Sequence, residues 1–323
     1  MFISCHDPRI AYTGRWYMGE KQAITTSTGS YFELGFAGET AVFRFDVHDV
    51  TRDVAHLYIS VDGSASVESP VVPFLRVKAG AGNHTVRLTL KSLSEFYDRW
   101  LTPEAKVGFL GFEAEDILPL PLDTRPIIEF IGDSITEGVE TDPTPYAIYD
   151  HFCKERVFQD DVTATYGYLT AEMLNMRPVI MGYGAVGVAK GGCGNVPMSK
   201  EAYPFCFSGA PVTAYEPSII VLNHGTNDGG HLDVLGERYK EMLDLLRNTH
   251  PHALVVALSP FMGDRDPIIE QAVTEYNQER NADVLYIPTG GLIPRHPIHP
   301  SRESHRVIAN HLAAILKDKL ATL

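Results

Sequence analysis

Ser134 and His299 are two side chains whose types and positions could carry out acyl transfer. Ser134 follows a mostly apolar run, residues 127–131, and a Gly-Asp turn, so a buried strand is predicted to end just before it. A serine at such a corner offers an exposed hydroxyl and a free backbone N–H, and acyl transfer needs both. A strand that ends in an ordinary Asp/Ser turn has the same composition, so this stretch alone leaves both interpretations open.

Three more motifs lie where the second half of the chain leaves the same edge of its predicted sheet. They are a glycine-rich turn at 182–188, Asn-His-Gly-Thr-Asn-Asp at 223–228, and Pro-Ile-His-Pro-Ser at 297–301. Ligands bind at this edge in α/β proteins, so we expect the motifs to form one site. His299 would take the proton of the Ser134 hydroxyl, which is inert at neutral pH without a base. Alternatively, Asn227 forms only an Asx turn and His299 merely precedes a helix.

Two domains are predicted, residues 1–122 and 123–323, with a proline-rich connector between them. Before residue 92 the chain shows no helical period, and turn signals separate short runs that are typical of strands. The runs predicted in the first domain are residues 31–36, 40–47, 55–61, 74–78, 84–91 and 107–114. Many short strands without helices indicate an all-β sandwich or jelly roll.

After the connector, short apolar strands alternate with helices, which predicts a parallel sheet covered on both sides. The predicted strands are residues 127–131, 178–181, 218–223, 253–259 and 284–287. One helix is marked by an apolar face of Leu235, Tyr239, Met242, Leu243 and Leu246. The last helix is expected to have Ser301 as its N-cap and to bury Ile308, Leu312, Ile315 and Leu316.

Two long segments, residues 139–162 and 190–217, fit neither pattern. We place both at the rim of the site, because long loops on compact α/β folds are usually functional or mobile. The second segment contains the aromatic residues Tyr203, Phe205, Phe207 and Tyr215. These rings either line the site or only pin the loop down, and the sequence does not separate the two roles.

The order Gly-Asp-Ser, glycine turn, Gly-x-Asn-Asp and His-Pro resembles the SGNH (GDSL) hydrolase family from residue 127 to the end of the chain. The resemblance implies a flavodoxin-like α/β hydrolase domain. It implies four site residues: the nucleophile Ser134, the base His299, the backbone donor Gly187 and the side-chain donor Asn227. With the N–H of Ser134, the two donors would form an oxyanion hole, in which each preorganised donor is worth about 3–4 kcal/mol. Gly184 and Gly191 lie nearby and leave the choice of glycine open.

The family usually has an aspartate three residues before its histidine, whereas this chain has His296 there. A second imidazole cannot replace a carboxylate as a charge partner. We therefore predict that Ser134 and His299 act as a dyad in which a backbone carbonyl orients His299. The alternative is a carboxylate from elsewhere, such as Glu137 or Asp228. Supporting residues of the site are expected among Asp133, Asp228 and His296.

The first domain is similar to the N-terminal jelly roll of carbohydrate esterase family 2, the two-domain acetyl-xylan esterase type. The similarity rests on residues 9–16, 30–40, 61–63 and 81–86. It implies removal of O-acetyl groups from a saccharide, and some members of that group lack the usual acid. Two alternatives stay open: a general short-chain carboxylesterase or thioesterase, and a carbohydrate-binding protein with a degenerate hydrolase half.

The amino-acid composition excludes two classes of binding partner. A formal net charge of −14 and a pI near 5.3 make nucleic acid and anionic membranes poor partners, and no stretch could span a bilayer. The first eight residues lack signal-peptide features, so we expect a cytoplasmic protein, with a homo-oligomer left open.

Reduced thiols are expected at Cys5, Cys153, Cys193 and Cys206, with a Cys193–Cys206 bridge as the minor alternative. We expect no cofactor and no metal, because no cysteine or acidic ligand accompanies His296, His299 and His305.

Overall fold

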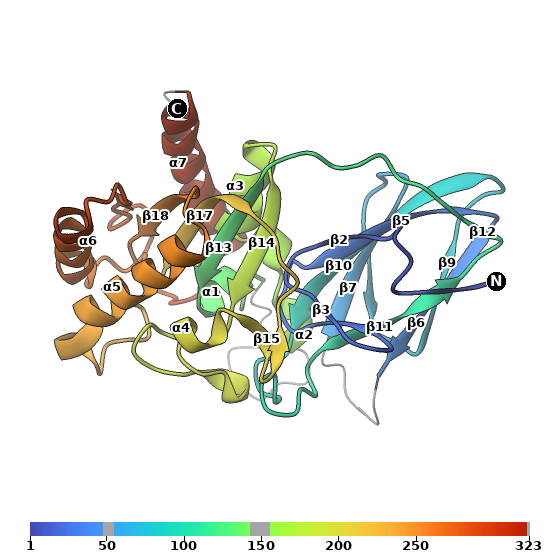
Figure 1. Ribbon diagram of the computed structural model, residues 1–323, viewed down its shortest axis with the longest axis horizontal. Coiled ribbons are helices and arrows are strands. Elements are labelled where there is room, and N and C mark those ends of the chain that lie inside the picture. The colour runs from blue at the N-terminus through green and yellow to red at the C-terminus, as the bar shows by residue number, and fades with distance from the viewer. Residues whose placement is uncertain (48–54, 143–155, 322–323) are drawn as a thin grey trace.

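The computed structural model describes residues 1–47, 55–142 and 156–321, which form a β-sandwich followed by an α/β domain (Figure 1). Alternating apolar and polar residues build the sandwich strands, as in β6 (Thr40–Asp46), where every second residue is buried. One face of each sheet therefore packs on a shared core. Stacked phenylalanines fill its centre, with the Phe32 and Phe109 rings 4.2 Å apart.

The sandwich consists of two antiparallel sheets. The first has the spatial order β3 (Tyr17–Met18), β4 (Ala23–Thr25), β11 (Val107–Glu113), β6 and β9 (Phe74–Lys78), with β1 (Phe2–Ser4) also paired to β11. The second has the order β12 (Asp116–Leu118), β5 (Tyr31–Ala37), β10 (Asn83–Leu93), β7 (Ala55–Val61) and β8 (Val67–Pro70), with β2 (Ala11–Thr13) also paired to β5. The six predicted strands are confirmed, whereas the strands of two to four residues are too short to show a period.

The α/β domain has the predicted five-stranded parallel sheet. Its order is β14 (Arg177–Gly182), β13 (Ile127–Gly132), β17 (Pro217–Asn223), β18 (Leu254–Leu258) and β19 (Leu285–Ile287). This is the doubly wound, flavodoxin-like order, in which the chain reverses direction of travel at β13. All six residues of β13 are buried, as expected of a strand covered on both faces.

Helices cover both faces of this sheet. Residues of α5 (Leu232–Thr249) and α6 (Asp266–Arg280) pack on one face, and those of α3 (Tyr166–Met173) and α7 (Arg302–Leu320) pack on the other. The five apolar residues predicted for the first helix are all buried in α5. Ser301 caps α7 as predicted, since its hydroxyl oxygen accepts the Ser304 N–H. The described residues include no helix that is long and apolar enough to cross a membrane.

The connector between the domains, residues 119–126, contains no helix or strand. The predicted division at 122/123 falls within it. A second link joins the domains in addition to the connector: Nη1 of the buried Arg15 in the sandwich lies 3.3 Å from Oε1 of Glu129 in β13. The domains are therefore joined by a buried contact as well as by the chain.

The aromatic residues of segment 190–217 lie where the sandwich meets β13 of the α/β domain, with Arg15 against Tyr203 and Tyr215. The Tyr203 and Tyr215 hydroxyls donate hydrogen bonds to the Glu129 carboxylate at 2.9 and 2.5 Å. The Phe205 and Phe207 rings lie edge-on to Trp100 and Tyr17, respectively. For these four rings the placement at the rim of the site is wrong, and the alternative, that they pin the segment down, is confirmed.

Three of the four cysteines are described, and all three are free thiols: Cys5, Cys193 and Cys206. The alternative Cys193–Cys206 bridge is therefore not present. Cys153 lies outside the described residues, as do residues 143–155 of the long segment predicted at the rim of the site.

Candidate active site

Ser134 lies at the carboxyl end of β13, where the strand turns directly into the short helix α1 (Ser134–Glu137). The Asp133 carboxylate caps that helix by accepting the Ile135 N–H at 3.0 Å. Gly132 has no room for a side chain, because an added Cβ would lie 2.1 Å from the Thr136 hydroxyl oxygen. As the first residue of the helix, Ser134 has a backbone N–H that no helical carbonyl can accept. The corner thus presents both a hydroxyl and an N–H.

His299 lies just before the N-cap of α7, and its Nε2 atom is 3.0 Å from the Ser134 Oγ atom. This distance is within the reach that a general base needs to take a proton. The predicted Ser134–His299 pair is therefore brought together by the fold, although the two residues are 165 positions apart.

A carboxylate orients the His299 ring. The Nδ1 atom of His299 is 2.6 Å from Oε2 of Glu140. The predicted dyad with a backbone carbonyl is therefore wrong. Ser134, His299 and Glu140 form a row of three side chains joined by hydrogen bonds, which we call the Ser134–His299–Glu140 line. The two carboxylates suggested by the sequence have other partners: Glu137 pairs with Arg99, and Asp228 accepts N–H groups of the glycine-rich turn.

Glu140 is held in its ionised form. Its hydrogen bond with His299, followed by the positive charge of Arg156, lowers the pKa of Glu140 to about 2 against the opposing effect of burial. An ionised Glu140 accepts the Nδ1–H of His299, which leaves Nε2 free of a proton and able to accept the Ser134 hydroxyl. The backbone of Glu140 has φ 53°, an uncommon conformation for a residue with a side chain, and its N–H donates to Asp160 at 2.8 Å.

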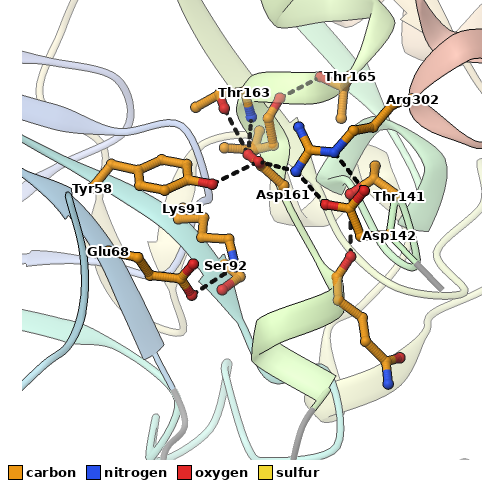
Figure 2. Close-up of polar contacts among 12 residues, drawn as sticks. Tyr58, Glu68, Lys91, Ser92, Thr141, Asp142, Asp161, Thr163, Thr165 and Arg302 are labelled. Atoms are coloured by element: carbon orange, nitrogen blue, oxygen red, sulfur yellow. Dashed lines mark hydrogen bonds and ion pairs between the residues drawn. The ribbon is translucent and has the colours of Figure 1, made fainter. Parts of the chain in front are cut away.

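The segment that carries Glu140 is fastened to the helix that follows His299 (Figure 2). Arg302, the first residue of α7, pairs with Asp142 and with Asp161, the latter at 2.7 Å. Tyr58 of the sandwich donates its hydroxyl hydrogen to the same Asp161 carboxylate at 2.8 Å. These contacts hold the acid-bearing and base-bearing segments side by side.

Asn227 lies beside the Ser134 corner. Its Nδ2 atom is 3.1 Å from Oδ2 of Asp133 and 3.3 Å from the Val186 carbonyl oxygen. Burial raises the pKa of Asp133 to about 6, and the hydrogen bond from the Ile135 N–H limits that rise. Asp133 therefore supports the site as predicted, by fixing both the serine corner and the Asn227 amide.

Gly187 also lies at the site, next to Asp228. A Cβ at Gly187 would lie 2.2 Å from Oδ1 of Asp228, which explains the glycine. Its N–H donates to the Lys190 carbonyl at 3.0 Å. Donation by Gly187 to an oxyanion would require that this hydrogen bond be shared or replaced. Of the other two glycines, Gly184 lies against Glu95 and Gly191 against the Val196 carbonyl.

The histidines near the C-terminus do not form a metal site. His299 uses both ring nitrogens in the line with Ser134 and Glu140, and Nδ1 of the buried His305 accepts the Tyr166 N–H at 3.1 Å. His296 is exposed and, within the described part of the chain, makes no hydrogen bond to His299 or Ser134. In residues 1–47, 55–142 and 156–321, no three His, Cys, Asp or Glu side chains are placed to hold a metal ion. The supporting role of His296 therefore stays a prediction.

Asn227 gives a first testable expectation. The variant Asn227→Ala should lower kcat on a short-chain ester by about 10²–10³-fold, because it removes the amide beside Ser134, which would share one of its N–H groups between Asp133 or Val186 and the oxyanion. Steady-state kinetics on p-nitrophenyl acetate would measure the change, with the exposed Asn83→Ala variant as the matched control. Unchanged kcat in Asn227→Ala would show that this amide does not stabilise the transition state.

The comparison with known families settles the class. The GDSL-like lipase/acylhydrolase family model matches residues 130–307, more than half of the chain. The chain belongs to this family. The match includes Ser134, Asn227 and His299, so these residues lie in a domain of a family of carboxylic ester hydrolases.

Relatives of this GDSL-like hydrolase share both of its domains. The cellulase/esterase CelE of Acetivibrio thermocellus is 25% identical over 97% of this chain, which spans only 40% of that protein. A family two carbohydrate esterase from Clostridium thermocellum, solved in complex with cellohexaose, has a TM-score of 0.78 at 24% identity and covers 97% of this chain and 100% of its own. The acetyl xylan esterase Est2A from the rumen bacterium Butyrivibrio proteoclasticus has a TM-score of 0.81 at 19% identity, with 100% of each chain covered. The predicted two-domain fold is confirmed.

Glu140 is the functional residue that the sequence prediction missed. It lies in the segment 139–162 that was assigned to the site for its length alone. The sequence did carry one signal, namely that the family position for the acid is occupied by His296. An acidic residue in an unassigned segment at the site was the place to look.

Proposed function

We propose that the protein is a serine esterase that removes O-acetyl groups from carbohydrates through an acyl-enzyme. The observation that carries the proposal is the Ser134–His299–Glu140 line, with hydrogen-bond distances of 3.0 and 2.6 Å. It occurs at the carboxyl end of the central strands, where α/β proteins bind their ligands.

In the proposed reaction, His299 takes the proton of Ser134 as Oγ attacks the acetyl carbonyl carbon. The negative charge that develops on the carbonyl oxygen is stabilised by the Ser134 N–H and the Asn227 amide. The protonated His299, stabilised by Glu140, then gives its proton to the departing sugar oxygen. A water molecule, deprotonated by His299, hydrolyses the acetyl-serine in a second half-reaction and restores the enzyme.

The carbohydrate part of the proposal rests on the relatives. The structural neighbours of this chain, which share its sandwich and its α/β domain, include an acetyl xylan esterase and a carbohydrate esterase bound to cellohexaose. An ester of acetic acid with a sugar hydroxyl is the substrate class that fits both descriptions. The net charge of −14 disfavours polyanionic substrates, and a neutral acetylated saccharide is compatible with it.

Two substrate series test the proposal. On p-nitrophenyl esters of increasing acyl length, kcat/KM should fall steeply beyond acetyl. On acetylated xylo-oligosaccharides, the enzyme should release acetate, measured by an enzyme-coupled assay. Release of no acetate from any acetylated saccharide would contradict the proposal.

The rival functions give different results in the same assays. A kcat/KM that rises with acyl length, or a preference for acyl-CoA, would indicate a general carboxylesterase or thioesterase. Binding of saccharides without hydrolysis of any ester would indicate a carbohydrate-binding protein. The intact line of Ser134, His299 and Glu140 favours an enzyme over the latter.

A further inference from the structure

Arg156 lies between the candidate acid and the sandwich. It is the first residue of α2 (Arg156–Gln159), and its side chain is 7% exposed. One terminal nitrogen, Nη1, pairs with Oε1 of Glu140, the oxygen that does not contact His299. The other, Nη2, donates to Oε1 of Glu95 at 2.7 Å. Arg156 thus bridges the Glu140 and Glu95 carboxylates with separate terminal nitrogens, and its Nε atom lies 3.6 Å from a third carboxylate, that of Asp160.

Glu95 belongs to the sandwich, two residues after the end of β10. Its side chain is 8% exposed, and its second oxygen faces the glycine-rich turn of the α/β domain. A Cβ at Gly184 would lie 2.0 Å from that oxygen, so Glu95 packs directly against the turn, and a side chain at Gly184 would displace its carboxylate. Glu95 is therefore held on both sides, by Arg156 and by the turn.

The sandwich also donates hydrogen bonds to backbone carbonyl oxygens of α2. The Lys91 ammonium group donates to the carbonyl oxygens of Val157 and Phe158 at 3.1 and 3.2 Å. The Ser92 hydroxyl donates to the Val157 carbonyl at 2.6 Å. Lys91 and Ser92 come from β10, and Lys91 is paired in turn with Glu68 of β8 (Figure 2). The first domain thus holds the backbone of the two residues after Arg156 as well as the charged end of Arg156 itself.

We propose that Arg156 is a positioning residue for Glu140 and that Glu95 holds Arg156 in place. The sandwich domain would then help to fix the carboxylate that orients His299. This inference rests on the proposed esterase function. Glu140 can orient His299 only if its carboxylate does not rotate, and a charge-assisted hydrogen bond to each of its oxygens prevents rotation. Arg156 in turn keeps its orientation because Glu95 accepts from its other terminal nitrogen.

The test uses the reaction of Ser134 with a fluorophosphonate, which reports serine reactivity without requiring a sugar substrate. The second-order labelling rate should fall about tenfold or more in Arg156→Met, because a charge-assisted hydrogen bond to the acid is lost. The same change introduced into Glu140→Gln should lower the rate no further, because Arg156 acts only through Glu140. Arg156→Lys, which keeps the charge, should recover part of the rate. On p-nitrophenyl acetate, kcat should fall with little change in KM.

Two isosteric variants provide the matched comparison. Glu95→Gln weakens the contact to Arg156, whereas Glu129→Gln weakens the more deeply buried contact between Arg15 and β13. Both should lower the melting temperature, but only Glu95→Gln should slow labelling. Because these variants keep the shape of the side chain, they decide the question even if Arg156→Met does not fold.

The outcomes separate this inference from the proposed function. If the wild type is labelled but Arg156→Met and Glu95→Gln react as fast as the wild type, the positioning role is overturned. It is also overturned if the losses of Arg156→Met and Glu140→Gln multiply, since Arg156 would then act by another route. If the wild type is labelled and these variants are slow, but no acetate is released from saccharides, the positioning role holds and the carbohydrate function fails. A wild type that is neither labelled nor active on esters would overturn both.

Discussion

Replacing Ser134 by alanine is expected to lower kcat on p-nitrophenyl acetate by roughly 10⁴–10⁶-fold, which is the scale at which loss of a serine nucleophile leaves only binding and oxyanion stabilisation. The reason is geometric. The Ser134 Oγ atom is the only partner of His299 Nε2 among the described residues, so no other side chain there is placed to form the acyl-enzyme. The substitution removes a single oxygen and leaves the Asp133 cap of α1 and the His299–Glu140 hydrogen bond in place, so the fold should persist.

Mass spectrometry would check this directly. A fluorophosphonate should form one adduct on the peptide that contains Ser134, and the adduct should be missing in Ser134→Ala. The sandwich variant Ser60→Ala removes a hydroxyl that donates to the Ser64 carbonyl at 2.7 Å, and it serves as the matched control that should be labelled like the wild type. Hydrolysis by Ser134→Ala at the rate of the wild type would exclude an acyl-serine mechanism.

The sequence predicted the Ser134–His299 contact because local rules apply to each part. Buried strands in a parallel sheet are recognisable as short apolar runs, and the residues that follow them must meet at one edge. The strand before Ser134 and the helix cap at Ser301 both have strong local signals, so the two side chains could be placed without knowing a single long-range contact. The fold of the α/β domain follows from the same signals.

The sequence could not predict the contacts that depend on how two irregular segments meet. Glu140 reaches His299 across 159 residues from a segment without periodicity, through a left-handed backbone conformation that no local pattern requires of a glutamate. The aromatic residues of segment 190–217 could not be assigned for a related reason. Tyr203 and Tyr215 turn toward Glu129 because a buried carboxylate needs donors, and nothing in the apolar run of β13 shows which residues supply them.

Replacing Glu140 by glutamine should lower kcat by roughly 10²–10⁴-fold, as expected when the carboxylate that fixes a catalytic imidazole is neutralised. A glutamine amide can donate to Nδ1 and so favour the tautomer with the proton on Nε2, which cannot accept the Ser134 proton. KM should change little, since Glu140 does not reach the serine side of the ring. Steady-state kinetics would measure both values, with Glu303→Gln, an exposed substitution in the first turn of α7, as the control.

The same variant makes a prediction about stability and pH. The pKa of Glu140 is lowered to about 2, so its ionised form stabilises the fold above the ordinary glutamate range near pH 4.3, and this contribution is lost as the pH falls toward 2. Denaturation curves should therefore show wild type more stable than Glu140→Gln near pH 6, with the difference shrinking between about pH 4 and pH 2. A difference that stays constant with pH would mean that Glu140 is not ionised against His299 and Arg156. A kcat of Glu140→Gln equal to that of the wild type would return the site to a Ser134–His299 dyad.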